Sequence, residues 1–350
     1  MSLQKALVLE KAKTPFVLSS IPIPKPGAGE ILIKVLACAL NPVDAAVQAI
    51  DIIPNVPYPA VLGLDVAGDV EEVGEGVEGY VKGDRVFLSA GYSMAYGGLQ
   101  QYTLKSVADP DIGKIPSHIS YSEAATIPLT FATAAIPLLS ANPIGAGLNP
   151  HFDPKVSFDG EPALVIGGGS SVGQFAIQIY KYLGFSTIIT YASSKHTEYL
   201  KSLGATHIID RTQVSLSTLP DALKSVTSQP IKNIYVASGI REGGEEAGYA
   251  CLAHGGQLVV AIPVTKKQED AEATGRRIYG VYGSAKIEPN IEFGKEMWKN
   301  LPRLVDEGVI KPNRLEVLPK GLHAVPDALP RFLTGGVSGV KLVVNPQETV

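Results

Sequence analysis

An apolar strand that runs into a glycine-rich turn and then into a helix most constrains the fold of this 350-residue chain. The strand is predicted over 163–167, the turn reads Gly-Gly-Gly-Ser-Ser-Val-Gly over 167–173, and apolar residues then recur at helical spacing up to Leu183. Glycines let a backbone turn sharply and approach a pyrophosphate, whose charge is met by the N-terminal N–H groups and dipole of the helix. The glycine spacing is one residue longer than the common dinucleotide fingerprint, and a purely structural turn is the alternative.

Short apolar segments on either side of this turn predict two kinds of architecture. Before residue 120, β-branched runs alternate with Pro-rich and Gly-rich turns, a pattern typical of a small barrel or sandwich. From about residue 160, strands alternate with helical segments, which predicts a parallel doubly wound sheet and an α/β fold class. These segments span 163–167, 172–183, 187–191, 196–203, 207–210, 231–237, 257–262 and 278–282, followed by a helix over 291–306 and a strand over 339–344.

The residues after the second of these strands bear on which dinucleotide binds. In NAD-binding domains, an Asp or Glu about 20 residues after the glycines accepts hydrogen bonds from the ribose 2′-hydroxyl. Here Ser193, Ser194, Lys195 and His196 follow the strand, so two hydroxyls and a lysine face a 2′-phosphate and no carboxylate is there to repel it. The sequence therefore predicts NADPH, with a solvated helix start capped by a serine as the alternative.

Composition argues against several classes of partner. With 30 basic and 34 acidic residues the net charge is −4, which favours neither nucleic acid nor an anionic membrane surface. Two cysteines are too few for a disulfide framework, and the first residues do not read as a signal peptide, so we expect a cytoplasmic protein. Residues 124–152 carry no Lys, Arg, Asp or Glu, but prolines interrupt them, so we expect a buried helix and a loop instead of a membrane span.

Several ordered motifs resemble those of the medium-chain dehydrogenase/reductase superfamily. They are Lys25–Val35, Leu62–Gly68, Gly83–Val86 and Glu123–Pro128. Within the superfamily, Asn41-Pro-Val-Asp44, the loop at 168–173 and Leu203-Gly-Ala205 resemble the zinc-free quinone-oxidoreductase and enoyl-reductase branch. The similarity is greatest to fungal enoyl reductases, including those that act in trans with polyketide synthases.

This resemblance implies a GroES-like barrel-type catalytic domain formed by 1–125 and 291–350, with a Rossmann NADPH-binding domain over 126–290. It implies that 170–173 hold the pyrophosphate and 193–196 the adenosine 2′-phosphate. It also implies that 41–44 approach the nicotinamide side, that Ala261 and Ile262 flank the nicotinamide, and that 338–340 close over the coenzyme. The implied cofactor-binding residues are Asn41, Asp44, Thr130, Ser170, Ser171, Val172, Gly173, Ser193, Ser194, Lys195, His196, Arg211, Ala261, Ile262, Ser338, Gly339 and Val340. The substrate pocket is expected to include Tyr58, Tyr96 and Thr133, although surface or core roles for the tyrosines and helix packing by the threonines stay open.

Departures from the family pattern shape the expected chemistry. Relatives in the fungal branch often place an aromatic residue and a lysine where this chain has Ala45 and Ala46, and a tyrosine where it has Arg211. Zinc alcohol dehydrogenases carry a cysteine near Cys38 and a Gly-His-Glu block where this chain has Gly63-Leu64-Asp65. Since no imidazole is available there, we expect no metal site. No catalytic acid is assigned.

Without a metal, reduction of a conjugated carbon–carbon double bond is a better match than reduction of a ketone. Hydride from the coenzyme adds to the β-carbon, the carbonyl oxygen is stabilised as an enolate, and the α-carbon takes a proton. The leading hypothesis is an NADPH-dependent reductase of α,β-unsaturated carbonyl compounds. NADPH:quinone reduction shares every motif, and an NADPH-binding structural or regulatory protein with little turnover is a third hypothesis. We expect a small-molecule substrate and a monomer or homodimer, with a polyketide synthase as a candidate partner.

Overall fold

The computed structural model of the protein describes residues 2–237, 243–261 and 271–350. The chain divides into two compact units. Unit 1 comprises Met1–Leu129, Leu301–Asp306 and Pro312–Val350, and unit 2 comprises Thr130–Asn300 and Glu307–Lys311. The divisions lie at 129/130 and 300/301, which is four and ten residues after the expected ones at 125/126 and 290/291. They fall inside two helices, α3 (Pro128–Leu139) and α9 (Ile291–Asp306), each of which begins in one unit and ends in the other.

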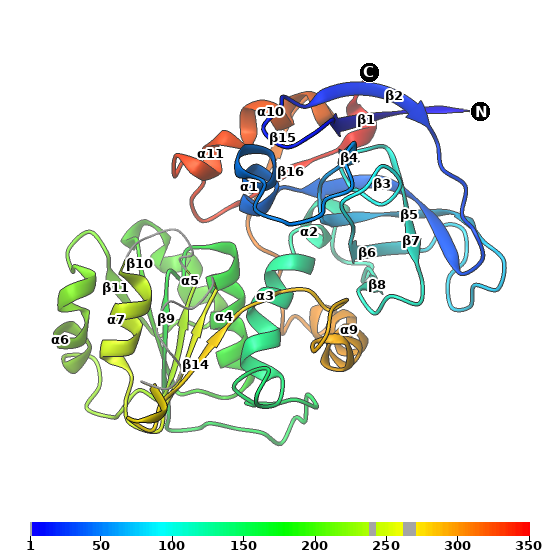
Figure 1. Ribbon diagram of the computed structural model, residues 1–350. Helices are drawn as coiled ribbons and strands as arrows, with labels where there is room; N and C mark the ends of the chain where they lie inside the picture. The colour runs from blue at the N-terminus through cyan, green and yellow to red at the C-terminus, as the bar shows by residue number, and fades with distance from the viewer. Residues whose placement is uncertain (1, 238–242, 262–270) are drawn as a thin grey trace. The chain divides into compact units, whose positions relative to one another are not determined.

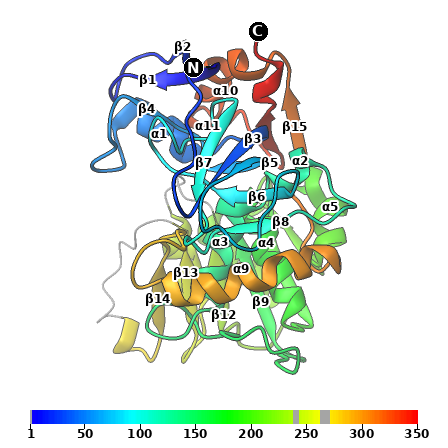
Figure 2. The same ribbon diagram turned by 90° about the vertical axis from the view of Figure 1, so that its right-hand side faces the viewer.

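Unit 1 holds an antiparallel β-structure, and Figures 1 and 2 show both ends of the chain within it. In the described residues its larger sheet has the order β15-β16-β3-β5-β6-β8, with β7 also paired to β3, and a smaller sheet has the order β2-β1-β4. Only the pair β15–β16 is parallel in these sheets. The strands are β1 (Leu3–Leu9), β2 (Val17–Pro22), β3 (Glu30–Ala39), β4 (Ala60–Val61), β5 (Asp65–Val73), β6 (Arg85–Ser89), β7 (Tyr102–Ser106), β8 (Ile112–Lys114), β15 (Leu315–Leu318) and β16 (Lys341–Val344).

Strand β3 is the centre of unit 1 because its ten residues are almost continuously apolar and buried. It pairs with β5 over most of its length and also with β7 and β16, so the C-terminal strand returns to the core of the N-terminal segment. This arrangement confirms the expected GroES-like class. The helices of unit 1 are short: α1 (Pro42–Ile50), α2 (Tyr121–Ala124), α10 (Val325–Ala328) and α11 (Pro330–Leu333), with 3₁₀ turns η3 (Gly321–Ala324) and η4 (Pro346–Glu348).

Unit 2 contains the predicted doubly wound sheet. Within the described residues, all its strands are parallel, in the order β11-β10-β9-β12-β13-β14. The strands are β9 (Pro162–Ile166), β10 (Thr187–Ala192), β11 (His207–Asp210), β12 (Asn233–Val236), β13 (Gln257–Val260) and β14 (Arg277–Gly280). The helices are α4 (Ser171–Tyr182), α5 (Thr197–Leu203), α6 (Leu219–Lys224) and α7 (Gly244–Cys251), with 3₁₀ turns η1 (Ser194–His196) and η2 (Leu216–Thr218).

The helices of unit 2 cover both faces of its sheet. Helix α4 packs with α5, α7 packs with α6, and Figure 1 shows these two pairs on opposite sides of the strands. The sequence favours this arrangement because every residue of β9 and β12 is buried and all but Asn233 are apolar or aromatic. The predicted Rossmann fold is therefore confirmed.

The uncharged stretch forms helix α3 followed by a loop. Together α2 and α3 are the one described segment, Tyr121–Leu139, that is long and apolar enough to cross a membrane by length and composition. Its most apolar window is 78% buried inside the protein, as in the core helix of a globular domain. Pro137 lies near the end of α3.

Candidate functional site

The carboxyl ends of four neighbouring strands form one edge of the sheet in unit 2. Ile166 of β9 pairs with Tyr191 of β10 and with Val236 of β12, and Val236 pairs with Val260 of β13. The segments that follow these strands therefore emerge at one edge, and they include the predicted phosphate loop and the predicted 2′-phosphate turn. In open α/β sheets, ligands bind at this edge where the strand order reverses, which here is between β9 and β12.

The phosphate loop has a shape that side chains would block. Gly167 has a φ of +87°, in the left-handed region. A Cβ atom at Gly168 would lie 1.9 Å from Thr190 Oγ1, and one at Gly173 would lie 2.4 Å from the carbonyl oxygen of Gly167. The loop backbone thus packs directly against β10 and the start of α4. Such a bare cradle before a helix fits the pyrophosphate of a dinucleotide.

Ser170 caps helix α4 at this loop. Its backbone is extended and its hydroxyl oxygen accepts a hydrogen bond from Gly173 N at 3.0 Å. Ser171 and Val172, both half-buried, begin the helix, where backbone N–H groups have no partner within the helix itself. The predicted pyrophosphate residues 170–173 are therefore together at the positive end of a helix of 12 residues.

The turn after β10 lies beside a carboxylate that the sequence analysis did not place there. Ala192 pairs with Asp210, whose Oδ1 accepts hydrogen bonds from Ser194 N at 3.4 Å and Thr212 N at 3.0 Å. Hydrogen bonds from Ser194 and Thr212 lower the pKa of Asp210 to about 2, so it is ionised at neutral pH. The expectation that no carboxylate faces this turn was wrong, because the parallel register of β10 and β11 brings one there.

Cationic and polar groups share the same turn. Lys195 is exposed, and within the described part of the chain it has no ion-pair partner. Arg211 follows Asp210 directly and is half-buried. His196 is buried, its backbone N–H donates to the carbonyl of Ser193 at 3.1 Å, and its ring lies 3.3 Å from the position of a Cβ on Gly169. The predicted 2′-phosphate residues are thus brought next to the phosphate loop, with one carboxylate among them.

The residues predicted near the nicotinamide in unit 2 are placed only in part. Ala261 directly follows β13 at the carboxyl edge of the sheet, whereas Ile262 lies outside the described residues. Thr130 is buried and Thr133 half-buried on α3. The carbonyl of Thr133 accepts a hydrogen bond from the Tyr235 hydroxyl at 2.8 Å, which links α3 to strand β12.

A cluster of buried polar side chains lies in the core of unit 1. Asp65 Oδ2 accepts a hydrogen bond from Asn41 Nδ2 at 2.9 Å and lies 2.8 Å from Lys341 Nζ. Lys341 Nζ also donates to Asn41 Oδ1 at 2.5 Å, and Asp65 Oδ1 accepts from Leu129 N at 2.7 Å. Asn41, Asp65 and Lys341 are each at most 2% exposed. We call these three residues, together with Asp44, the polar cluster.

Asp44 closes the start of helix α1 in this cluster. Its Oδ2 accepts from Asn41 N at 2.8 Å and its Oδ1 from Gly63 N at 3.2 Å. Burial raises the pKa of Asp44 to about 7, and the neighbouring carboxylate adds to the shift while the two backbone hydrogen bonds and the ammonium oppose it. Burial also raises the pKa of Cys38, with both carboxylates adding to the effect, so its thiol is neutral at physiological pH.

The segment Ser338–Val340 leads directly into β16 and hence into the polar cluster. Gly339 is buried and has a φ of +72°, while Ser338 is exposed. Lys341 N donates to the carbonyl of Arg314 at 2.7 Å, which fixes the first residue of β16. The predicted contacts Asn41, Asp44 and 338–340 are therefore neighbours in unit 1, although they are about 300 residues apart in the chain.

The two tyrosines predicted for the substrate pocket are bound to surface carboxylates. Tyr58 donates to Asp51 Oδ1 at 2.9 Å, and Tyr96 donates to the carboxylate of Glu30. Partial burial, with the Asp51 hydrogen bond, raises the pKa of Tyr58 to about 12. The Glu30 hydrogen bond, with burial, raises that of Tyr96 to about 12. Both phenols therefore hold their protons tightly, and in the described part of the chain these two hydrogen bonds link them to neither the polar cluster nor the sheet edge.

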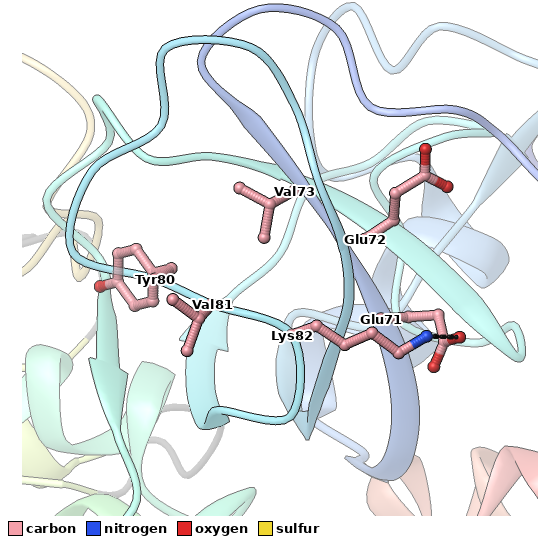
Figure 3. A pocket seen from close by; sticks show the side chains of 6 residues that line it. All are labelled: Glu71, Glu72, Val73, Tyr80, Val81 and Lys82. Atoms are coloured by element: carbon pink, nitrogen blue, oxygen red, sulfur yellow. Dashed lines mark hydrogen bonds and ion pairs between the residues drawn. The ribbon is translucent and has the colours of Figure 1, made fainter.

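An open hollow on unit 1 is separate from both groups of predicted residues. It is lined by Glu71, Glu72, Val73, Tyr80, Val81 and Lys82. Figure 3 shows Lys82 Nζ paired with Glu71, at 2.7 Å, while the carboxylate of Glu72 points away from the pair. The pair is exposed to solvent, and none of the lining residues was predicted to contact coenzyme or substrate.

Cys38, Leu64 and Asp65 stand where the resemblance places residues of the zinc site in zinc alcohol dehydrogenases. Leu64 stands in place of the imidazole, both oxygens of Asp65 accept hydrogen bonds, and Cys38 is a buried neutral thiol. Among the residues that the structure describes, no group of three His, Cys, Asp or Glu side chains is placed to hold a metal ion.

Comparisons with known proteins agree with this geometry. The family model described as "Alcohol dehydrogenase GroES-like domain" matches residues 27–127, and the one described as "Zinc-binding dehydrogenase" matches residues 171–301. The dehydrogenase azaJ of Aspergillus niger is 32% identical over 345 residues, covering 94% of this chain and 95% of its own length. The trans-enoyl reductase tndF of Aspergillus flavipes is 32% identical over 365 residues, covering 97% of this chain and 98% of its own.

The chain belongs to the medium-chain dehydrogenase/reductase superfamily. Among solved structures, the quinone oxidoreductase from Coxiella burnetii is similar with a TM-score of 0.74 and 26% identity, over 98% of this chain and 99% of its own. Members of this superfamily bind NAD(P), and its relatives with printed activities are oxidoreductases. The resemblance read from the sequence is confirmed.

Sequence reasoning missed three residues of this superfamily member that the geometry brings to the candidate sites. Asp65 was noted only as part of a block without histidine, and its carboxylate turns out to join Asn41, Lys341 and Leu129. Lys341 carried no local signal, because its partners are far away in the chain. Asp210 could have been found from the strand register alone, since it ends the strand next to β10.

Proposed function

We propose that the protein is an NADPH-dependent reductase that transfers hydride to the carbon–carbon double bond of α,β-unsaturated carbonyl compounds, without zinc. The observation that carries this proposal is a dinucleotide cradle together with Leu64 in place of the zinc-binding imidazole and an adjacent Asp65 whose carboxylate is bonded to Asn41, Lys341 and Leu129. Relatives named trans-enoyl reductases, about a third identical over nearly the whole chain, support the choice of reaction.

The residues of unit 2 fit the adenosine diphosphate half of the coenzyme. The loop of Gly168 and Gly173 would hold the pyrophosphate against the start of α4. Ser194 and Lys195 would bind the 2′-phosphate through charge-assisted hydrogen bonds. The carboxylate of Asp210 opposes a phosphate there, but its hydrogen bonds to two backbone N–H groups hold it against the protein. The preference for NADPH thus depends on the opposing charges of Lys195 and Asp210 at the turn after β10.

When bound, the reduced nicotinamide supplies hydride for the double bond. The protein contributes orientation, which is worth several kcal/mol when two reactants are held in reacting geometry. Tyr58 and Tyr96 are poor proton donors because their pKa values are raised to about 12. We therefore assign the proton at the α-carbon to solvent, and we assign orientation of the nicotinamide to Asn41 and its neighbours.

Quinone reduction is the second candidate function. It is favoured by the similarity to a solved quinone oxidoreductase at 26% identity over nearly the whole chain. Both reactions use the same coenzyme and the same cradle. They differ only in the acceptor.

The proposal is tested by incubating the protein with NADPH or NADH and a panel of enals, enones, enoyl thioesters and quinones, with the products identified by mass spectrometry. We expect a product two mass units heavier, saturated at the former double bond, and faster turnover with NADPH. Turnover of quinones alone would replace the leading function by the second. Coenzyme binding with no turnover of any acceptor would favour a structural or regulatory protein.

A further inference from the structure

We propose that Lys341 is a positioning residue for the nicotinamide end of the coenzyme, because its buried ammonium fixes Asn41 and Asp65 and, through them, segments proposed to contact the coenzyme. This inference rests on the proposed function and adds a residue to it. Nothing in the local sequence around Lys341 marks it for such a role.

The ammonium of Lys341 decides how the amide of Asn41 is oriented. Asn41 Oδ1 accepts from Lys341 Nζ, while Asn41 Nδ2 donates to Asp65 Oδ2 and, at 3.3 Å, to the carbonyl of Ala39. The reverse orientation would place the NH₂ group against the ammonium and the amide oxygen against the carboxylate. With Lys341 in place, only one orientation of Asn41 satisfies every partner.

Lys341 also ties the C-terminal strand to this site. It is the first residue of β16 and directly follows Ser338–Val340, the segment proposed to close over the coenzyme. Strand β16 pairs antiparallel with the end of β3, and Leu40 N donates to the carbonyl of Leu342 at 2.8 Å. The side chain and the backbone of Lys341 therefore hold residues 338–340 next to Asn41.

The other two partners extend the same network. Asp65 accepts the backbone N–H of Leu129, the residue before Thr130, at the start of α3. Asn41 donates its own backbone N–H to Asp44 at the start of α1. The proposed contacts Asn41 and Asp44 thus belong to this network. Thr130 and the segment 338–340 directly adjoin Leu129 and Lys341, which belong to it as well.

Stability alone does not account for a buried lysine here. Removing two charges from water is costly, and well-packed apolar residues often replace a buried ion pair without loss of stability. Unit 1 contains a second lysine of this kind, Lys105, which is 1% exposed and pairs with Asp109, Asp111 and the carbonyl of Ser89. None of these partners is a proposed coenzyme contact, so Lys105 provides a matched control.

The experiment compares Lys341→Met with Lys105→Met in the full-length protein. The dissociation constant for NADPH is measured by fluorescence of the reduced nicotinamide, and kcat and its primary isotope effect are measured with an accepted enone and NADPH whose two C4 hydrogens are replaced by deuterium. For Lys341→Met we expect a dissociation constant within about threefold of wild type, a kcat at least about tenfold lower, and a larger isotope effect, because misplaced reactants slow the hydride step. Lys105→Met should change kcat and the isotope effect by less than about twofold.

A double variant keeps the test decisive if Lys341→Met does not fold. Lys341→Met combined with Asp65→Asn removes both charges together, so folding should recover while kcat stays low, because Asn41 still lacks the ammonium that fixes the orientation of its amide. The inference would be overturned if Lys341→Met had the same kcat and the same isotope effect as Lys105→Met. If Lys341→Met does not fold, the double variant takes its place in this comparison.

Failure of the proposed function gives a different result. If wild-type protein binds NADPH but reduces no acceptor, the emission of the bound nicotinamide still reports how it is seated. The inference then predicts a changed emission in Lys341→Met at an unchanged dissociation constant. Identical emission spectra in wild type and Lys341→Met would overturn the inference independently of any turnover.

Discussion

The sheet edge of unit 2 and the polar cluster of unit 1 both contain charged and polar groups, but they are built in opposite ways. At the sheet edge, backbone N–H groups and exposed side chains such as Lys195 are presented on loops that are close together in sequence. In the polar cluster, Asp65 and Lys341 are buried and satisfy each other. The first arrangement is suited to receiving a ligand's phosphates, and the second to holding a backbone geometry fixed.

The comparison predicts its largest effect in the buried cluster. Asp65→Ala would leave the ammonium of Lys341 and the N–H of Leu129 buried without the carboxylate that they share, which should lower the free energy of unfolding by about 3–5 kcal/mol. Urea unfolding monitored by circular dichroism measures this change.

The control is an ion pair of similar length on the surface. Asp221 and Lys224 lie 2.8 Å apart and are both mostly exposed, so Asp221→Ala should leave unfolding unchanged within error. Equal losses in the two variants would remove the distinction between the buried and the exposed arrangement.

The pH dependence of the free energy of unfolding should show when Asp44 in the polar cluster loses its proton. The pKa of Asp44 is raised from 3.8 to about 7, so the folded protein keeps a proton that the unfolded chain releases. The contribution of Asp44 to the free energy of unfolding is fully present below pH 4 and is lost as the pH rises to about 7. At 1.36 kcal/mol for each pKa unit, the loss is on the order of 4 kcal/mol.

Asp44→Asn removes this titration. Urea unfolding of wild type and Asp44→Asn across pH 4 to 8 should show a steeper loss of stability with pH in the wild type. Parallel curves for the two proteins would show that Asp44 has an ordinary carboxyl pKa, and the cluster would then be less isolated from water than its burial indicates.

The sheet edge should respond to a change of backbone shape. A Cβ on Gly173 would meet the carbonyl oxygen of Gly167 at 2.4 Å and the Cα of Gly168 at 2.8 Å, so the loop would have to move. Gly173→Ala should raise the dissociation constant for NADPH by about 100-fold, which is about 2.7 kcal/mol. Isothermal titration calorimetry measures it.

Gly169→Ala is the comparison within the same loop. Its Cβ would meet only the His196 ring, at 3.3 Å, so we expect a much smaller loss of affinity. If both substitutions weakened NADPH binding equally, the close contact of Gly173 with the backbone of Gly167 and Gly168 would not be what shapes the site.

The smallest predicted effects concern the choice of coenzyme. Lys195→Ala should weaken NADPH about tenfold more than NADH if one phosphate contact worth ~1.4 kcal/mol is lost. Asp210→Asn keeps the Oδ1 that accepts from Ser194 N and Thr212 N but removes the charge, so it should favour NADPH. Both effects are measured as dissociation constants for NADPH and NADH. If Lys195→Ala weakened the binding of both coenzymes equally, Lys195 would not bind the 2′-phosphate.

The same contrast explains how much the sequence could predict. The fold class and the glycine cradle are properties of neighbouring residues, and both were readable from local patterns. Asp210 was missed because it reaches the turn through strand register across 16 residues of chain. Lys341 was missed because its contact with Asn41 spans 300 residues and depends on how the last strand returns to β3.

The most direct test of the proposed chemistry is isotope transfer from coenzyme to product. Protein treated with a chelator and dialysed is given NADPH with both C4 hydrogens replaced by deuterium and an enoyl thioester, and the product is examined by nuclear magnetic resonance. We predict one deuterium at the β-carbon, a solvent proton at the α-carbon, and a rate that added zinc does not raise. A product without deuterium at the β-carbon, or turnover that requires zinc, would contradict the proposed reaction.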